Sequence, residues 1–306
     1  MDMEGLRSPH KRLRRDRKVA RVVAGLARWR NAFLVRCLLA LLLLYFIAPI
    51  IWTISSSLKT RAELFQATPS FVTLTPTLAN YQYAIRRLTG FDVFFRNSLM
   101  VTLGATVLQT LLATLAGYGF ARLVFRGRDF IFYSMIMLIF VPRAGGLMAQ
   151  YELMSFLGLR NSILGLILAF SSGLAVPVFI MRQAFLNLPR DFEDAALIDG
   201  CNRLQAFWYV MAPMVVGASM VVALFEFIRV WGEYLFTLTM IDDRDLFTLG
   251  IGMAMQFLPG IALEFGEFTS YGAQAAAFCL ASAPVVTFFL ATQRWFVRGL
   301  MEGLKF

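Results

Sequence analysis

The sequence predicts an all-α polytopic membrane protein with six transmembrane helices. Of its 306 residues, 58% are hydrophobic, and the mean hydropathy is +0.66. A soluble chain of this length could not bury so much apolar surface. Six apolar stretches are also long enough to cross about 30 Å of hydrocarbon as helices. They lie near residues 33–55, 98–121, 130–149, 163–181, 214–236 and 273–295, within a transmembrane domain that we assign to residues 33–296.

The basic residues predict that both termini are cytoplasmic. The first 36 residues contain eleven Lys and Arg residues, so residues 1–32 form a basic arm that is attracted to anionic headgroups of the bilayer. With both termini inside, 20 of the 29 basic residues face the cytoplasm and 8 lie in outside loops. Residues 297–306 are then a cytoplasmic tail. We expect no nucleic-acid partner, because the arm lacks interleaved aromatic residues and a folded domain.

The six stretches differ in how clearly they begin and end. The first starts too far into the chain and is too long for a signal peptide, so it is expected to remain as a membrane anchor. The third is interrupted by Pro142, Arg143, Gly145 and Gly146, where a helix either kinks or ends. The long connections at residues 57–97 and 237–272 lie outside in this topology, and the second is acidic, with Glu264 and Glu267 among its carboxylates.

No set of residues predicts catalysis. The cysteines Cys37, Cys201 and Cys279 lack metal-ligand spacing, and the Gly145-Gly146 pair lacks the lysine of a phosphate-binding loop. We therefore expect no metal or cofactor in this chain and do not expect it to be an enzyme. If ATP and Mg²⁺ drive its function, a partner subunit must bind them.

A polar segment at residues 189–213 separates the fourth and fifth stretches. Its residues favour a short helix from Phe192 to Leu197, with the carboxylates of Glu193 and Asp194 in the first turn, where the helix dipole favours them. Gly200 would end or bend this helix before a second one. The pair could be a compact knob for a partner's groove or an ordinary interfacial loop, and these features alone do not decide between the two.

The same segment resembles the EAA signature of ABC importer permeases. Asp194-Ala195-Ala196 is followed after three residues by Gly200, and after nine more by Val210-Met211-Ala212-Pro213. Features in the expected order elsewhere resemble the carbohydrate branch, in particular the smaller maltose-type permease. They are Asn97-Ser98, Gly117-Tyr118-Gly119-Phe120-Ala121-Arg122, Leu157-Gly158-Leu159-Arg160-Asn161-Ser162, Trp231-Gly232-Glu233-Tyr234 and the C-terminal stretch from Gly299 to Lys305. Asp194 replaces the usual glutamate, Ala212 replaces a leucine, and Gly232-Glu233 departs from the usual pattern after Trp231.

The resemblance implies a type I ABC importer permease of the bacterial cytoplasmic membrane. It implies a heterodimer with a second permease subunit, an ATP-binding subunit dimer, an external solute-binding protein, and import of a sugar or oligosaccharide by alternating access. The residues that would couple the chain to the ATPase are Glu193, Asp194, Ala195, Ala196, Asp199, Gly200 and Pro213. The alternatives are import of another solute, such as glycerol-3-phosphate or a polyol, and a membrane scaffold subunit that transports nothing.

A charged face on the fifth stretch is the second candidate site. Glu226, Arg229 and Glu233 are spaced by three and four residues, so they share one side of a helix. Charges inside a membrane usually face water or the interior of a bundle. The face could border the translocation path or a subunit interface, or it could be a purely structural ion pair. Other candidates for a polar route are Trp231, Tyr234, Gln150 and Tyr151.

Overall fold

The computed structural model describes residues 9–66, 68, 70–86, 90–141, 146–257 and 271–303, and within these ranges it describes side chains from residue 32 to 255 and from 271 to 295. Over these ranges the fold is all-helical. The elements are α1 (Pro9–Leu58), α2 (Arg61–Leu64), α3 (Ala79–Arg86), α4 (Phe91–Arg122), α5 (Arg128–Met137), η1 (Leu138–Phe140), α6 (Leu147–Phe156), α7 (Ile163–Ser171), α8 (Ala175–Leu186), α9 (Asp191–Ile198), α10 (Arg203–Ala206), η3 (Phe207–Met211), α11 (Ala212–Met214), α12 (Val216–Trp231), α13 (Leu235–Met240), η4 (Arg244–Leu246), α14 (Leu249–Phe257) and α16 (Tyr271–Gly303).

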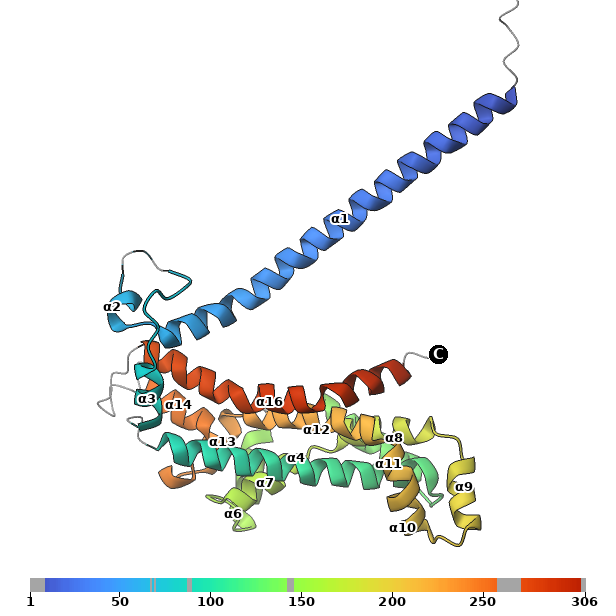
Figure 1. The fold of residues 1–306 in the computed structure, drawn as a ribbon. Coiled ribbons are helices and arrows are strands. Elements are labelled where there is room, and N and C mark those ends of the chain that lie inside the picture. Colours follow the sequence, from blue (N-terminus) through green and yellow to red (C-terminus); the bar gives the residue numbers. More distant parts are fainter. Residues whose placement is uncertain are drawn as a thin grey trace, which may run out of the picture.

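Helix α4 lies at the centre of the bundle (Figure 1). It packs against α7, α8 and α12, and α16 lies against α12. The C-terminal end of α1 contacts α16, and the rest of α1 extends away from the other helices. Helices α9 and α10 lie at one end of the bundle, and α2 and α3 lie at the opposite end.

Within the described ranges, three helices are long and apolar enough to cross a membrane, and they coincide with the predicted first, second and sixth stretches. These spans are Ala32–Leu58, Phe91–Arg122 and Tyr271–Trp295. Two bent pairs would raise the count to five: α7 with α8, bent by 52°, and Arg203–Met214 with α12, bent by 74°. The predicted fourth stretch is therefore not one straight helix. Its break precedes Pro177, which occupies the first turn of α8, where a missing amide N–H removes no helical hydrogen bond.

The third and fifth predicted stretches also differ from straight helices. Helix α5 and the 3₁₀ turn η1 end at Phe140, and α6 begins at Leu147, so residues 130–149 do not form one continuous helix. The interrupting residues Pro142, Arg143 and Gly145 lie outside the described residues, as do Glu264 and Glu267 and the ends of both predicted termini, 1–8 and 304–306. In the fifth stretch α12 ends at Trp231, and α13 follows after Gly232.

Two hydrophobic clusters fill the bundle. One contains Phe94, Leu166 and Ile251, near the end where α2 and α3 lie, and the other contains Met181, Phe185 and Phe207, near α9. Buried polar side chains of the middle of the bundle include Gln109 and Glu226, which are 1% and 3% exposed. Because such groups are costly in an apolar interior, each needs a partner.

The loop after α1 is organised by one carboxylate. Glu63 accepts hydrogen bonds from the Thr73 hydroxyl (2.8 Å) and from the backbone amides of Leu74 (3.1 Å) and Thr75 (3.3 Å). It also completes a capping box with Thr60 at the start of α2. The Thr73 hydrogen bond is the largest of the effects that lower the pKa of Glu63 from 4.5 to about 2.

We expect this loop to loosen in acid because its order depends on the charged form of Glu63. A lowered pKa in the folded state means that the stabilisation is complete above pH 4.5 and is lost as the pH falls from 4.5 toward 2. Hydrogen exchange at the Leu74 and Thr75 amides, corrected for intrinsic rates, should accelerate over this range. Glu63→Gln should exchange rapidly at pH 7 and show no such transition. A wild-type loop with equal protection at pH 6 and pH 2.5 would contradict the prediction.

Candidate functional site

The first candidate site is the helical element α9–α10, which lies outside the main bundle (Figure 1). The first turn of α9 carries Asp191, Glu193 and Asp194, whose charges interact favourably with the helix dipole. The helix ends at Ile198, Gly200 just beyond it has φ +91°, and the amides of Gly200 and Cys201 donate to Leu197 O (3.2 Å) and Ala196 O (3.0 Å). These are the two hydrogen bonds of a Schellman motif, which uses the left-handed conformation that glycine adopts without strain.

Helix α10 begins with a second cap. Asn202 and Gln205 form a capping box, in which the Gln205 amide donates to Asn202 Oδ1 (2.9 Å) and the Asn202 amide donates to Gln205 Oε1 (2.8 Å). The two helices are thus fixed at the turn that joins them. This explains how a polar segment of two short helices keeps a defined shape outside the bundle.

The predicted coupling residues divide into exposed and buried groups. Asp194, Ala195 and Asp199 are exposed, and Ala196 is only 6% exposed. Ile198, also on α9, is 85% exposed. The outer face of α9 therefore offers a carboxylate, a small residue and an apolar side chain to water or to a partner.

Glu193 instead faces its own chain. The Tyr118 hydroxyl of α4 donates to Glu193 Oε1 (2.7 Å), and Arg122 Nε lies 3.6 Å from Glu193 Oε2. The side chains of Arg122 and Glu193 are 5% and 14% exposed. The sequence grouped Glu193 with Asp194 as anions offered to an ATPase; in the structure the Glu193 carboxylate is already bound by α4.

Pro213 lies where the chain re-enters the bundle. Residues Phe207–Met211 form a π-helical segment, and Pro213 follows in the first turn of α11. In an uninterrupted α-helix its ring would clash with the carbonyl of Tyr209, four residues earlier. Pro213 thus accounts for the local widening of the helix, and the 74° bend comes directly after it.

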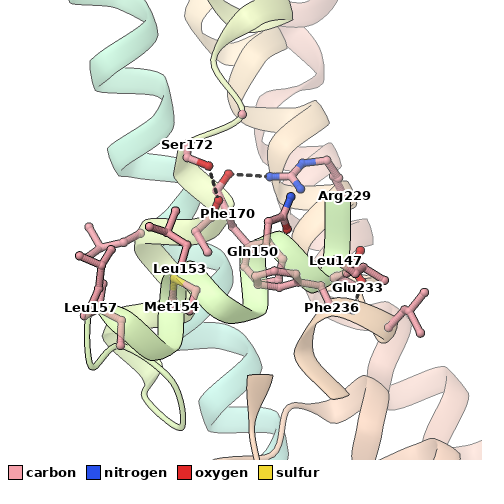
Figure 2. Close-up of a pocket in the computed structure, with 15 residues that line it drawn as sticks. Leu147, Gln150, Leu153, Met154, Leu157, Phe170, Ser172, Arg229, Glu233 and Phe236 are labelled. Atoms are coloured by element: carbon pink, nitrogen blue, oxygen red, sulfur yellow. Dashed lines mark hydrogen bonds between the residues drawn. The ribbon is translucent and has the colours of Figure 1, made fainter. Parts of the chain in front are cut away.

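The second candidate site is a cavity of about 660 Å³ among α6, α7, α12 and α13 (Figure 2). Its walls are mostly apolar, with Leu153, Phe170 and Phe236 among the lining residues. The polar lining is contributed by Gln150, Ser172, Gly173, Arg229 and Glu233. Small-molecule sites typically have this volume and this mixture of apolar walls with a few polar groups.

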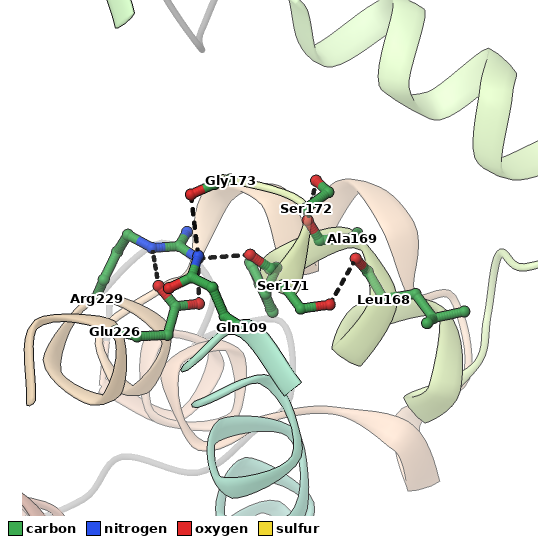
Figure 3. Close-up of polar contacts among 9 residues, drawn as sticks. Gln109, Leu168, Ala169, Ser171, Ser172, Gly173, Glu226 and Arg229 are labelled. Carbon is green, nitrogen blue, oxygen red and sulfur yellow. Dashed lines mark hydrogen bonds and ion pairs between the residues drawn. The ribbon is translucent and has the colours of Figure 1, made fainter. Parts of the chain in front are cut away.

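The break between α7 and α8 forms one wall of the cavity. Backbone carbonyls at such a break lose their helical partners and must find others within the membrane. Arg229 donates to Phe170 O (2.8 Å), and Gln109 donates to Gly173 O (3.1 Å) (Figure 3). One side chain from α12 and one from α4 therefore provide hydrogen-bond donors for two backbone carbonyls at this break.

Glu226 neutralises Arg229 behind the cavity wall. Arg229 Nε donates to Glu226 Oε2 (2.8 Å), and a second guanidinium nitrogen binds the other carboxylate oxygen (Figure 3). Such bidentate pairing suits a buried carboxylate. The Arg229 side chain remains 29% exposed, whereas that of Glu226 is only 3% exposed.

The other predicted path residues lie in different places. Gln150 and Glu233 line the cavity with Arg229, and Glu233 also accepts from the Phe236 amide (2.8 Å) at the start of α13. Trp231 donates to Ala281 O (2.9 Å) and stacks on Phe227. Tyr151 packs under the Arg160 guanidinium, 4.1 Å from the ring centroid, and Tyr234 packs against the hydrophobic cluster that contains Phe94.

Sequence reasoning missed the groups at the break beside the cavity, which are Phe170, Ser172 and Gly173, and their partner Gln109. A signal existed for the break, because Ser171-Ser172-Gly173 interrupts an apolar run just before Pro177. A second signal was Gln109, an uncharged polar residue within the second apolar stretch.

The fold and the two sites define a multi-span helical membrane protein with a cavity among its helices and a polar helical element outside the bundle. The chain belongs to the family described as binding-protein-dependent transport system inner membrane components, whose model matches residues 27–302. It is therefore a multi-pass protein of the bacterial inner membrane and a permease component of a transport system that depends on a binding protein.

Individual relatives agree with this assignment. The chain is 33% identical over 267 residues to the sulfoquinovosyl glycerol transport system permease protein SmoH of Agrobacterium fabrum, covering 86% of this chain and 90% of the relative. It is 30% identical to the arabinooligosaccharides transport system permease protein AraQ of Bacillus subtilis, with 86% and 92% covered. It is 32% identical to the maltose/maltodextrin transport system permease protein MalG of Vibrio parahaemolyticus, with 78% and 84% covered.

A solved structure with the same fold supports the assignment. It is a crystal structure of a bacterial ABC transporter involved in the import of the acidic polysaccharide alginate, with a TM-score of 0.76 and 21% identity. The alignment covers 87% of this chain and 96% of the matched chain. The helical arrangement is therefore that of an ABC importer permease.

Proposed function

We propose that the chain is the transmembrane permease subunit of an ATP-driven importer for a sugar or oligosaccharide. The observation that carries the proposal is the position of α8. This helix begins at the break beside the cavity and ends just before α9, so a displacement of α9 would be transmitted to the cavity wall. Alternating access then follows from movement of α8 at the break.

The proposal includes three kinds of protein partner. A second permease subunit completes the membrane pathway, and an ATP-binding subunit dimer receives α9, with Asp194, Ala195, Asp199 and Gly200 at the contact. An external solute-binding protein delivers the solute. ATP and Mg²⁺ bind to the ATPase, and the chain itself carries no cofactor in this proposal.

The proposed topology has six crossings with both termini in the cytoplasm. The third crossing is the stretch near residues 130–149, in which α5, η1 and the start of α6 are described. The fourth crossing is the bent pair α7–α8, and the fifth is formed by α12 after the 74° bend, so α10 stays outside the membrane. The uneven distribution of Lys and Arg supports this orientation, because it places α9–α10 and the basic arm on the same side of the membrane.

The cavity favours a hydroxylated solute over a phosphate ester. Among its described lining residues, Arg229 is the single basic side chain, and Glu226 already neutralises it. Glu233 adds a carboxylate, which would repel a phosphate. Glycerol-3-phosphate is therefore the weaker candidate, and a polyol remains compatible. A scaffold that transports nothing would need no such cavity.

Gln150→Leu should test the cavity as the solute path. Gln150 lines the cavity and is exposed, so its loss should not disturb packing. Losing one hydrogen bond of about 1 kcal/mol should lower uptake roughly fivefold in a reconstituted importer, without loss of ATPase association. Met148→Leu is the matched control, since Met148 lies on the same helix, is 71% exposed and is not among the cavity's lining residues.

Solute-stimulated ATP hydrolysis by the assembled importer tests the proposal as a whole. A sugar presented with its binding protein should raise hydrolysis and accumulate inside proteoliposomes. If Gln150→Leu transports like Met148→Leu, the solute does not use this cavity. If no hydroxylated solute is transported while an assembled complex exists, the proposed function itself is wrong.

A further inference from the structure

The inner end of α4 is tied to α9 by a buried polar cluster that the coupling motif does not include. Tyr118, Arg122 and Glu193 form this cluster, which we call the α4–α9 clamp. The Tyr118 hydroxyl donates to Glu193 at 2.7 Å, and the guanidinium of Arg122 lies 3.6 Å from the same carboxylate. Tyr118 is only 6% exposed, so the clamp is shielded from water.

Arg122 and Tyr118 of the clamp also contact the C-terminal end of α8. Arg122 donates to Phe185 O (2.8 Å), in the last turn of α8, and to Leu188 O (2.7 Å), just beyond the end of that helix. The Tyr118 ring packs edge-on against Phe185, with centroids 5.5 Å apart, and lies 5.0 Å from Phe207 of η3. One tyrosine and one arginine therefore contact α8, α9 and η3 at once.

Close packing fixes α4 against α8 one residue before the clamp. A Cβ at Gly117 would lie 2.5 Å from Met181 Cβ and 2.9 Å from the Arg182 amide nitrogen, so the two backbones are nearly in contact. Helix α9 is different: it has eight residues and a mostly exposed surface. A helix this short is marginal alone and depends on tertiary contacts.

We propose that Glu193 is a positioning residue that locks α9 to α4 and α8, so that the three helices move as one body when a partner displaces α9. The inference rests on the proposed function. It assigns different roles to the two adjacent carboxylates. Asp194 faces outward to the ATPase, whereas Glu193 faces inward and transmits the movement. Without the clamp, α9 would still dock, but its displacement would bend the chain locally and would not move α4 and α8.

The test uses Tyr118→Phe in the assembled importer. This change removes the hydroxyl and keeps the ring that packs against Phe185 and Phe207. Hydrogen bonds to charged groups are strong enough that exchange at the amides of Asp199 and Cys201, which donate to Ala195 O and Ala196 O of α9, should accelerate roughly tenfold. Solute moved per ATP hydrolysed should fall several-fold, while the ATPase still copurifies. Tyr209→Phe, which removes a hydroxyl from a tyrosine that is 75% exposed, is the matched control.

A double-variant comparison separates the clamp from general destabilisation. Glu193→Gln alone should lower the transport-to-hydrolysis ratio, and Tyr118→Phe should lower it less when Glu193→Gln is already present, because the hydroxyl then loses a neutral partner in place of a carboxylate. Additive losses, or a wild-type ratio in Tyr118→Phe, would overturn the clamp. Asp194→Lys should behave differently and lose ATPase association. If Glu193→Gln loses association in the same way, Glu193 is a docking residue and the inference fails, although the proposed function stands.

Discussion

Gly200→Val is expected to abolish ATP-driven uptake while the protein still inserts into the membrane. Gly200 has φ +91°, and its amide and that of Cys201 satisfy the last carbonyls of α9. An L-residue in the left-handed region costs about 1–2 kcal/mol, and a β-branched residue more. The space around Gly200 is open, so the backbone conformation and not crowding would cause the loss. Transport assays in proteoliposomes and copurification with the ATPase measure the effect.

Gly200→Asn is the control for that expectation. Asparagine tolerates the left-handed conformation, so it should retain most of the uptake that valine abolishes. Equal yields of both variants in the membrane fraction would show that insertion is intact. Normal uptake by Gly200→Val would mean that the turn after α9 does not need this conformation and that the coupling role assigned to it is wrong.

Arg229→Met should destabilise the bundle by about 3–5 kcal/mol, because it leaves a buried carboxylate without its cation. Glu226 is 3% exposed, and Arg229 supplies the hydrogen bonds to both of its oxygens. The substitution also removes the donor to Phe170 O at the break after α7. The melting temperature in detergent and the yield of folded protein should both drop sharply.

Two companion variants identify the cause. Arg229→Met combined with Glu226→Gln should recover much of the lost stability, because the unpaired charge is gone. Arg229→Lys should lie between wild type and Arg229→Met, since an ammonium group keeps the charge but cannot make the planar bidentate contact. Wild-type stability and transport in Arg229→Met would show that this charged face is not critical.

The long apolar runs of the fold and the interruption of the third run could be predicted from sequence, and the two bends of 52° and 74° could not. Helices cover residues 33–55, 98–121 and 273–295 because hydropathy and length alone specify a membrane-crossing helix there. The fourth stretch breaks before Pro177, and the fifth begins at a bend of 74° that comes directly after Pro213. A hydropathy average is insensitive to single prolines, so it could not reveal where these bends occur.

The candidate sites could be predicted in part for a related reason. The turn at Gly200 and the pairing of Glu226 with Arg229 follow from spacing within one element. The inward direction of Glu193 depends on Tyr118, which lies 75 residues earlier. Likewise, Gln150 joins Arg229 at the cavity only because α6 packs against α13 and lines the cavity together with α7 and α12. Such contacts arise from tertiary packing, which local patterns do not contain.

The π-helical segment Phe207–Met211 has a consequence for residues far beyond it. A π turn accommodates one residue more than an α turn, and each residue in a helix corresponds to a rotation of about 100°. An uninterrupted α-helix through this segment would thus turn everything that follows by about a quarter of a circle. Because α12 lies at 74° to the segment before it, that rotation would swing the whole of α12, with Glu226 and Arg229, away from its place against α4 and α16. The direction in which α12 runs is therefore set near Pro213, at the entrance to the bundle, well before the charges themselves occur in the chain.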